Sequence, residues 1–117
     1  MQNKIVIEIY ETKNGRYPYV EWEAKLSKMI RAIVTTRLAR MRIGNFGDCK
    51  SIQGAKGIYE LRIHISPGYR IYFGKDEDKI ILLLLGGNKR SQKKDIQKSY
   101  EYWQDYLISK WRRDEKK

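Results

Sequence analysis

The sequence predicts a single α+β domain over residues 1–117, with an N-terminal strand, one or two helices, a three-stranded antiparallel meander and a C-terminal helix. Residues 58–65 and 69–73 alternate apolar and polar side chains, which is typical of strands with one buried face. Residues 80–85 are apolar throughout, which indicates a strand covered on both faces. Apolar residues in 18–44 and 96–111 recur every three or four positions, as in amphipathic helices.

The turn sequence Ser66-Pro67-Gly68 joins the first two strands of the predicted meander. A three-residue loop fixes their register, and cross-strand partners share a face of the sheet. This register predicts the pairs Ile65–Tyr69, His64–Arg70, Arg62–Tyr72 and Leu61–Phe73. We expect 58–65 outermost, 69–73 next and 80–85 inside, with a strand at Lys4–Tyr10 on the remaining flank of a four-stranded sheet.

Capping and turn residues predict where the helices and hairpins begin. Pro18 suits the first turn of a helix that runs to about Gly44, either as one helix or as two if Ser27 is an N-cap. Gly86-Gly87 predicts a sharp exit from the sheet, and Ser91 is the expected N-cap of the final helix.

Three adjacent carboxylates follow the second strand of the meander, in the segment Lys75-Asp76-Glu77-Asp78. A metal site is one interpretation, but no matching ligands are evident elsewhere in the sequence. We therefore expect a solvated hairpin turn, and no metal or other cofactor.

The chain has 25 Lys and Arg against 14 Asp and Glu, a net charge of +11 and a pI near 9.8. This balance indicates a polyanionic or acidic partner. A membrane surface is the alternative, although no apolar run is long enough to span a bilayer. The N-terminus lacks a signal-peptide pattern, and the single Cys49 fits a reducing compartment, so a cytoplasmic location is expected.

Basic residues gather near two predicted elements. Arg62, His64, Arg70 and Tyr72 are expected on one sheet face, together with Glu60, and arginines so placed suit a phosphate. Helix N-termini favour anions, and Lys89, Arg90, Lys93 and Lys94 surround the start of the final helix. Lys50 and Lys56 precede the first meander strand. The alternative for each cation is an ordinary solvated surface, which we also expect for the outer helix face with Lys25, Lys28, Arg31, Arg37, Arg40 and Arg42.

The order of elements, with the segments YELRI, GYRIYF and ILLLLGGNKRSQKKDI, resembles the RelE/ParE superfamily of toxin–antitoxin toxins. The resemblance is strongest to the HigB-like, phage-derived addiction-module killer branch. It implies a compact α+β fold and a cognate antitoxin, acidic or bearing a DNA-binding helix-turn-helix, that covers the basic cleft. RelE- and HigB-type members cut mRNA in the ribosomal A site, whereas ParE-type members poison DNA gyrase.

The chemistry of the residues favours a metal-independent, ribosome-dependent mRNA endonuclease that inhibits translation. RNA is cut when its 2′-OH attacks the adjacent phosphate, which requires a base, an acid and a stabilised phosphorane. Arg62 and Arg70 match the strand arginines of the superfamily and are expected to stabilise the phosphorane. Tyr72 is expected to stack on a base or orient the hydroxyl.

The general acid and base stay open at this level. Lys89 and Lys56 are candidate bases, and His64, the only imidazole, is a candidate for either role. Two other functions remain as alternatives: a non-enzymatic gyrase inhibitor that binds through its helices, and a basic RNA-binding accessory protein that cleaves nothing.

Overall fold

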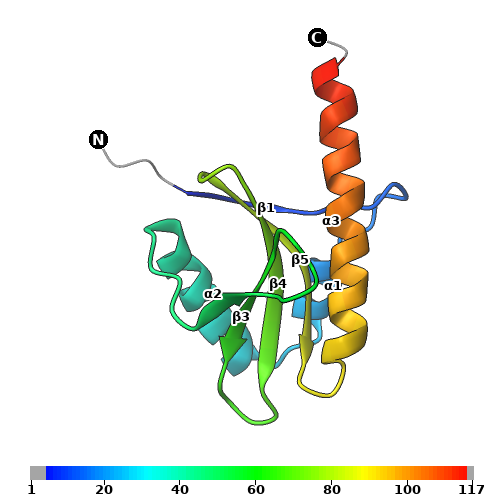
Figure 1. Ribbon diagram of the computed structural model, residues 1–117. Coiled ribbons are helices and arrows are strands. Elements are labelled where there is room, and N and C mark those ends of the chain that lie inside the picture. The colour runs from blue at the N-terminus through cyan, green and yellow to red at the C-terminus, as the bar shows by residue number, and fades with distance from the viewer. Residues whose placement is uncertain (1–4, 116–117) are drawn as a thin grey trace.

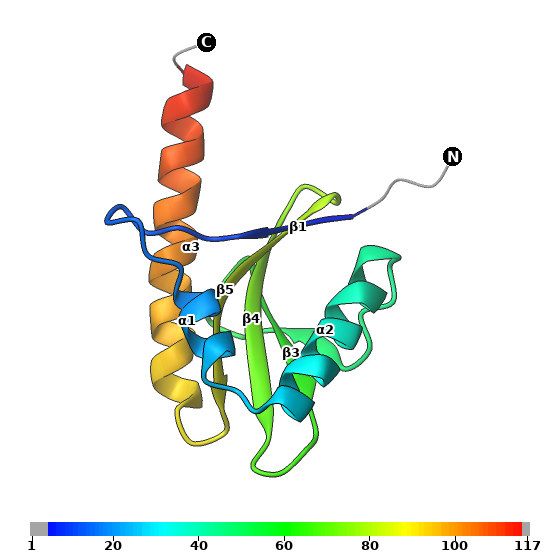
Figure 2. The ribbon, with the colours of Figure 1, turned by 180° about the vertical axis from the view of Figure 1, so that it is seen from behind.

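The computed structural model describes residues 5–115, which form one five-stranded sheet with helices on both faces. The elements in chain order are β1 (Val6–Ile9), α1 (Pro18–Ala24), α2 (Lys28–Arg42), β2 (Cys49–Ser51), β3 (Ile58–Ile63), β4 (Tyr69–Asp76), β5 (Ile80–Asn88) and α3 (Gln92–Glu115). α1 and α2 pack on one face of the sheet and α3 on the other. In Figure 1 α3 lies to the right of β5, in front of β1 and α1, with α2 to the left of the sheet, and Figure 2 shows α1 and α2 from behind.

The sheet has the order β1-β5-β4-β3-β2, so the predicted four-stranded sheet is one strand short. The additional strand, β2, has only three residues, too few for alternation to be recognisable, and it pairs antiparallel with β3. The prediction that 58–65 forms the outermost strand was therefore wrong. β1 takes the flank beside β5 as expected, and it runs parallel to β5. Of the predicted strand Lys4–Tyr10, Lys4 lies outside the described residues.

The register of β3 and β4 differs by two residues from the predicted one. Arg62 lies opposite Arg70 and Ile63 opposite Tyr69, so the predicted pairs His64–Arg70 and Arg62–Tyr72 were wrong. The connection spans five residues, 64–68, because β3 ends at Ile63. A shift of two residues leaves every side chain on its original face, so the predicted division between the two faces is preserved.

Each face of the sheet carries its own core. On the α2 side, Val34 and Met41 are fully buried with Ile71 and other strand residues. On the α3 side, Trp103 packs with Tyr72 and with apolar residues of β3 and β5. β5 contributes to both clusters, with Leu83 in the first and Leu82 and Leu84 in the second, which confirms that 80–85 is covered on both faces.

Ser27 separates α1 from α2 and accepts a hydrogen bond from the backbone N–H of Ile30 at 3.2 Å, which confirms the two-helix alternative. The glycine pair lies inside β5 rather than at its exit, so the predicted break at Gly86-Gly87 was wrong. Glycine is required there by close approach: a Cβ on Gly86 would overlap the ring of Trp22, and one on Gly87 would overlap the Asp95 carboxylate.

Replacing Ser27 with alanine is expected to lower the free energy of unfolding by about 1 kcal/mol, because the N–H of Ile30 loses its acceptor. Urea unfolding followed by circular dichroism measures this loss. Ser27→Asp keeps an acceptor and serves as the control. Equal stability of the alanine variant and the wild-type protein would contradict the capping role.

The predicted solvated turn at 75–78 is shorter than expected, since β4 extends through Asp76. Asp76 is buried and accepts hydrogen bonds from the Tyr106 hydroxyl and the Lys110 amine, both at 2.6 Å. Burial raises the pKa of Asp76, but the hydrogen bonds from Lys110 and Tyr106 outweigh it, so this pKa lies below its ordinary value. Within residues 5–115 no group of three His, Cys, Asp or Glu side chains could hold a metal ion.

Asp76→Asn is expected to lower the free energy of unfolding at pH 7 by about 2 kcal/mol, the scale of hydrogen bonds to a charged group. A depressed pKa in the folded state stabilises above the unfolded-state pKa, near about 3.9, and this stabilisation is lost as pH falls through the folded pKa. The difference between wild type and variant should therefore narrow below about pH 4. Thermal unfolding from pH 3 to 7 tests this, and a pH-independent difference would contradict it.

The C-terminal end of α3 projects past the sheet (Figure 1). Leu107 and Trp111 belong to the amphipathic pattern of 96–111, yet they are exposed by 37% and 64%. No helix in the described part of the chain is long and apolar enough to cross a membrane.

Candidate functional site

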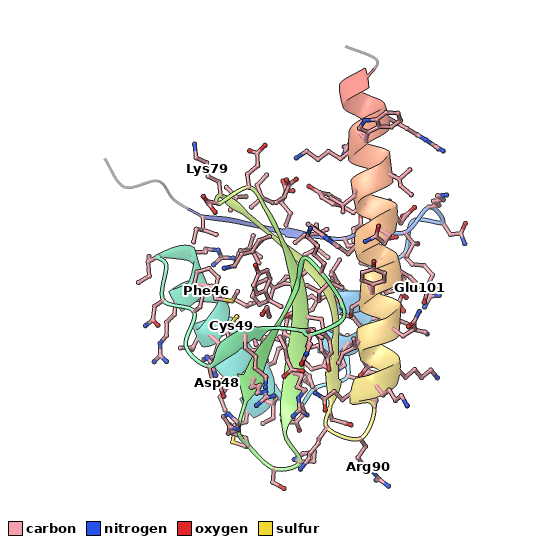
Figure 3. The ribbon with its side chains drawn as sticks, in the orientation of Figure 1. Phe46, Asp48, Cys49, Lys79, Arg90 and Glu101 are labelled. Atoms are coloured by element: carbon pink, nitrogen blue, oxygen red, sulfur yellow. The ribbon has the colours of Figure 1, made fainter. Side chains whose placement is uncertain are left out.

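A pocket of about 230 Å³ lies where the β3–β4 loop faces the connection from β5 to α3. Both connections occupy the same end of the sheet in Figure 1. In Figure 3 Asp48 marks the β2 side of this end and Arg90 the α3 side. Its lining consists of Arg62, Ile63, His64, Gly68, Tyr69, Arg70 and Lys89. Two guanidiniums, an amine and an imidazole thus border one small opening.

The two arginines lie opposite each other on neighbouring strands and share a buried carboxylate, Glu60. Arg62 donates from Nε to Glu60 Oε1 at 2.6 Å, and Arg70 Nε lies 3.5 Å from Glu60 Oε2. The side chains of Arg62 and Arg70 are 26% and 12% exposed. The hydrogen bond to Glu60 raises the pKa of Arg62, so its guanidinium stays charged and is held in place.

His64 and Lys89 complete the rim of the pocket. His64 follows β3 directly, and its Nε2 pairs with the carboxylate of Asp48. This pairing lowers the pKa of Asp48. His64 lines the same pocket as Arg70, although the cross-strand partner of Arg70 is Arg62. Lys89 follows the last residue of β5 and is exposed.

Tyr72 does not belong to this opening. Its side chain is fully buried beneath α3, and its hydroxyl has no hydrogen-bond partner among the described residues. Burial, reinforced by the nearby carboxylates of Glu60 and Asp95, raises the pKa of Tyr72 far above its ordinary value. The prediction that Tyr72 stacks on a base was therefore wrong, because α3 covers this part of the face.

The remaining predicted cations are exposed but lie outside the pocket lining: Lys50, Lys56, Arg90, Lys93 and Lys94. Arg90 is placed by the side chain of Asn88, whose Oδ1 accepts the backbone N–H groups of Arg90 and Ser91 at 2.9 and 3.2 Å. Ser91 precedes α3 as expected, although its hydroxyl donates to Asp95.

Three further residues, to which the sequence pattern assigned no role in the site, support the two arginines. Glu60 precedes Arg62 by two residues on the same strand, so the sequence already places both side chains on one face of the sheet. Gln92 donates to Glu60 Oε2 at 3.0 Å and so connects α3 to the arginines. Arg37, predicted on a solvated helix face, instead donates to the backbone carbonyl of Arg62 at 3.0 Å.

A larger cavity of about 780 Å³ lies between β1 and the C-terminal half of α3. Its lining includes the carboxylates of Glu8, Glu11 and Asp105, with Arg113 as its one cation among the described residues. Such an acidic lining repels phosphates. For an RNA ligand the smaller, basic pocket is therefore the better site despite its size.

The fold has a known counterpart among solved structures. A mutant of the E. coli toxin RelE, with two arginines replaced by alanine and in the free state, superimposes with a TM-score of 0.62. The match covers 84% of this chain and 96% of that chain at 13% sequence identity. The protein therefore has a RelE-like α+β fold.

No family model matches the sequence. An uncharacterized protein of Haemophilus influenzae (strain Rd) is 40% identical over 79 residues, which represent 67% of this chain and 78% of that protein. The chain belongs to the same family as this Haemophilus protein.

Proposed function

We propose that the protein is the toxin of a toxin–antitoxin module, of the HigB-like branch, and cuts mRNA on the ribosome without a metal ion. The observation that carries this proposal is the convergence of Arg62, Arg70, Lys89 and His64 on one open pocket. The RelE-like fold supports the assignment to a toxin.

The pocket supplies the groups that cleavage through the 2′-OH requires. Guanidiniums bind phosphate oxygens with two parallel N–H groups, so Arg62 and Arg70 stabilise the charge that builds up on the phosphorane. His64 is held through Nε2 by Asp48, which leaves Nδ1 for proton transfer. Lys89 is the second candidate for an acid–base role, while Lys56 lies outside the pocket.

Purified protein added to ribosomes programmed with a defined mRNA tests the proposal. We expect new 5′ ends within the A-site codon, mapped by primer extension, and no cleavage of the same mRNA without ribosomes. Intact mRNA on programmed ribosomes would reject the nuclease. We also propose that a cognate antitoxin, acidic or bearing a helix-turn-helix, covers the pocket in the cytoplasm.

A gyrase inhibitor is the second candidate, because α3 presents apolar side chains beyond the sheet. Leu107, Ile108 and Trp111 are exposed by 37%, 50% and 64%, and such a helix surface suits binding to another protein. Stalled gyrase–DNA complexes together with intact mRNA would favour this function. Binding of RNA that weakens with salt, without cleavage or gyrase inhibition, would instead indicate an accessory RNA-binding protein.

A further inference from the structure

Glu60 is a buried acid at the centre of a basic site. Its residue is 1% exposed, and its carboxylate meets side chains from three different elements. Arg62 of β3 donates to it at 2.6 Å, Gln92 of α3 donates at 3.0 Å, and Arg70 of β4 forms an ion pair at 3.5 Å. A carboxylate buried beside a phosphate pocket needs a reason, because it partly cancels the positive charge that the pocket offers.

Both arginines face Glu60 with the same edge of the guanidinium. The contacting atom is Nε in each case. Among residues 5–115 no hydrogen bond occupies the terminal Nη groups of Arg62 or Arg70, and both side chains line the pocket. Glu60 thus holds Arg62 Nε by a hydrogen bond. It attracts Arg70 Nε, a buried nitrogen with no hydrogen-bond partner among the described residues, by charge, and it leaves the Nη groups of both arginines for a ligand.

We propose that Glu60 is a positioning residue that aligns the two guanidiniums so that their Nη groups bind one and the same phosphate. This inference rests on the proposed function for its substrate, an RNA phosphodiester. Without Glu60, two guanidiniums at opposed strand positions would repel each other and rotate apart. Gln92 extends the restraint to the first turn of α3.

The charge of Glu60 distinguishes this role from ordinary binding. Removing the carboxylate makes the pocket more positive, so the ground-state attraction for RNA is kept or strengthened. Alignment with the phosphorane is lost, and interactions made only in the transition state act on kcat. A positioning role therefore predicts that kcat falls while KM does not rise.

Glu60→Gln retains the shape of the side chain and removes its charge. On programmed ribosomes we expect kcat to fall about a hundredfold, the scale of a misplaced catalytic group, with KM unchanged or lower. Glu60→Asp restores the carboxylate and should recover part of the loss in kcat. Asp76→Asn is the matched control, since Asp76 is another buried acid of the sheet but lies away from the pocket. It should leave kcat and KM unchanged at a temperature where circular dichroism shows every variant folded.

A second measurement does not depend on cleavage. The Nε–Hε signals of Arg62 and Arg70 are followed by NMR during titration with inorganic phosphate, and Arg→Lys variants assign them. In the wild-type protein we expect both signals to shift with one shared Kd. In Glu60→Gln they should no longer shift together.

The two measurements separate the two ideas. A shared phosphate response that depends on Glu60, in a protein that cuts no mRNA, would retain the positioning role and remove the nuclease. Folded Glu60→Gln with wild-type kcat and a wild-type phosphate response would overturn the positioning role and leave the nuclease standing.

Discussion

Arg62→Ala is expected to lower mRNA cleavage on programmed ribosomes by about two to three orders of magnitude, as when a contact to the transition-state anion is lost. The side chain lines the pocket and belongs to neither core cluster, and Glu60 retains Arg70 and Gln92 as partners. The variant should therefore remain folded by circular dichroism. Arg70→Ala is expected to cause a loss of the same size.

Arg112→Ala is the charge-matched control, because Arg112 is exposed near the distant end of α3. It removes one positive charge without touching the pocket, so cleavage should stay at the wild-type level. Arg62→Lys keeps the charge but loses the planar guanidinium fork, so its rate of mRNA cleavage should lie between the rates of Arg62→Ala and Arg112→Ala. If Arg62→Ala and Arg70→Ala both cut mRNA and inhibit growth as well as Arg112→Ala does, the two pocket arginines play no part in the mechanism.

Trp103→Ala is expected to lower the free energy of unfolding by about 3–5 kcal/mol, the range for removing a buried large aromatic side chain. Trp103 is 4% exposed, and its ring stacks on Tyr106 with centroids 5.4 Å apart. The indole also fills the space beside two glycines, since a Cβ at Gly57 or Gly74 would overlap it. Truncation therefore leaves a cavity beside two residues that have no side chain to fill it.

Trp111→Ala is the internal comparison, because it changes the same residue type on the same helix at 64% exposure. Trp111→Ala should change the free energy of unfolding by no more than about 0.5 kcal/mol. Urea unfolding of both variants followed by circular dichroism measures the difference. Similar losses in the two variants would contradict the assignment of the α3 core to Trp103.

Much of the sheet could be predicted because alternation records which side chains share a face. The predicted β3–β4 register was displaced by two residues, yet Arg62 and Arg70 remained on one face, since side chains repeat every second residue. The error came from the loop, whose length the turn residues alone did not fix. β2 was missed because three residues give no period.

The errors at the site have a different cause. A sequence pattern shows that Tyr72 shares a face with Arg62, but not where along the strands a helix covers that face. α3 buries Tyr72 and leaves the end with Arg62 open. Contacts between distant segments were equally unreadable, including the hydrogen bond from Gln92 to Glu60.

The parallel pairing of β1 with β5 determines when the protein can complete its fold during synthesis. Val6 must wait for Ile80, and the Tyr10 hydroxyl for Asp105, and closing such long loops is slow. Lys89 and Gln92 emerge later than both pocket arginines. The nascent chain therefore cannot complete this pocket until Lys89 and Gln92 have left the ribosomal exit tunnel.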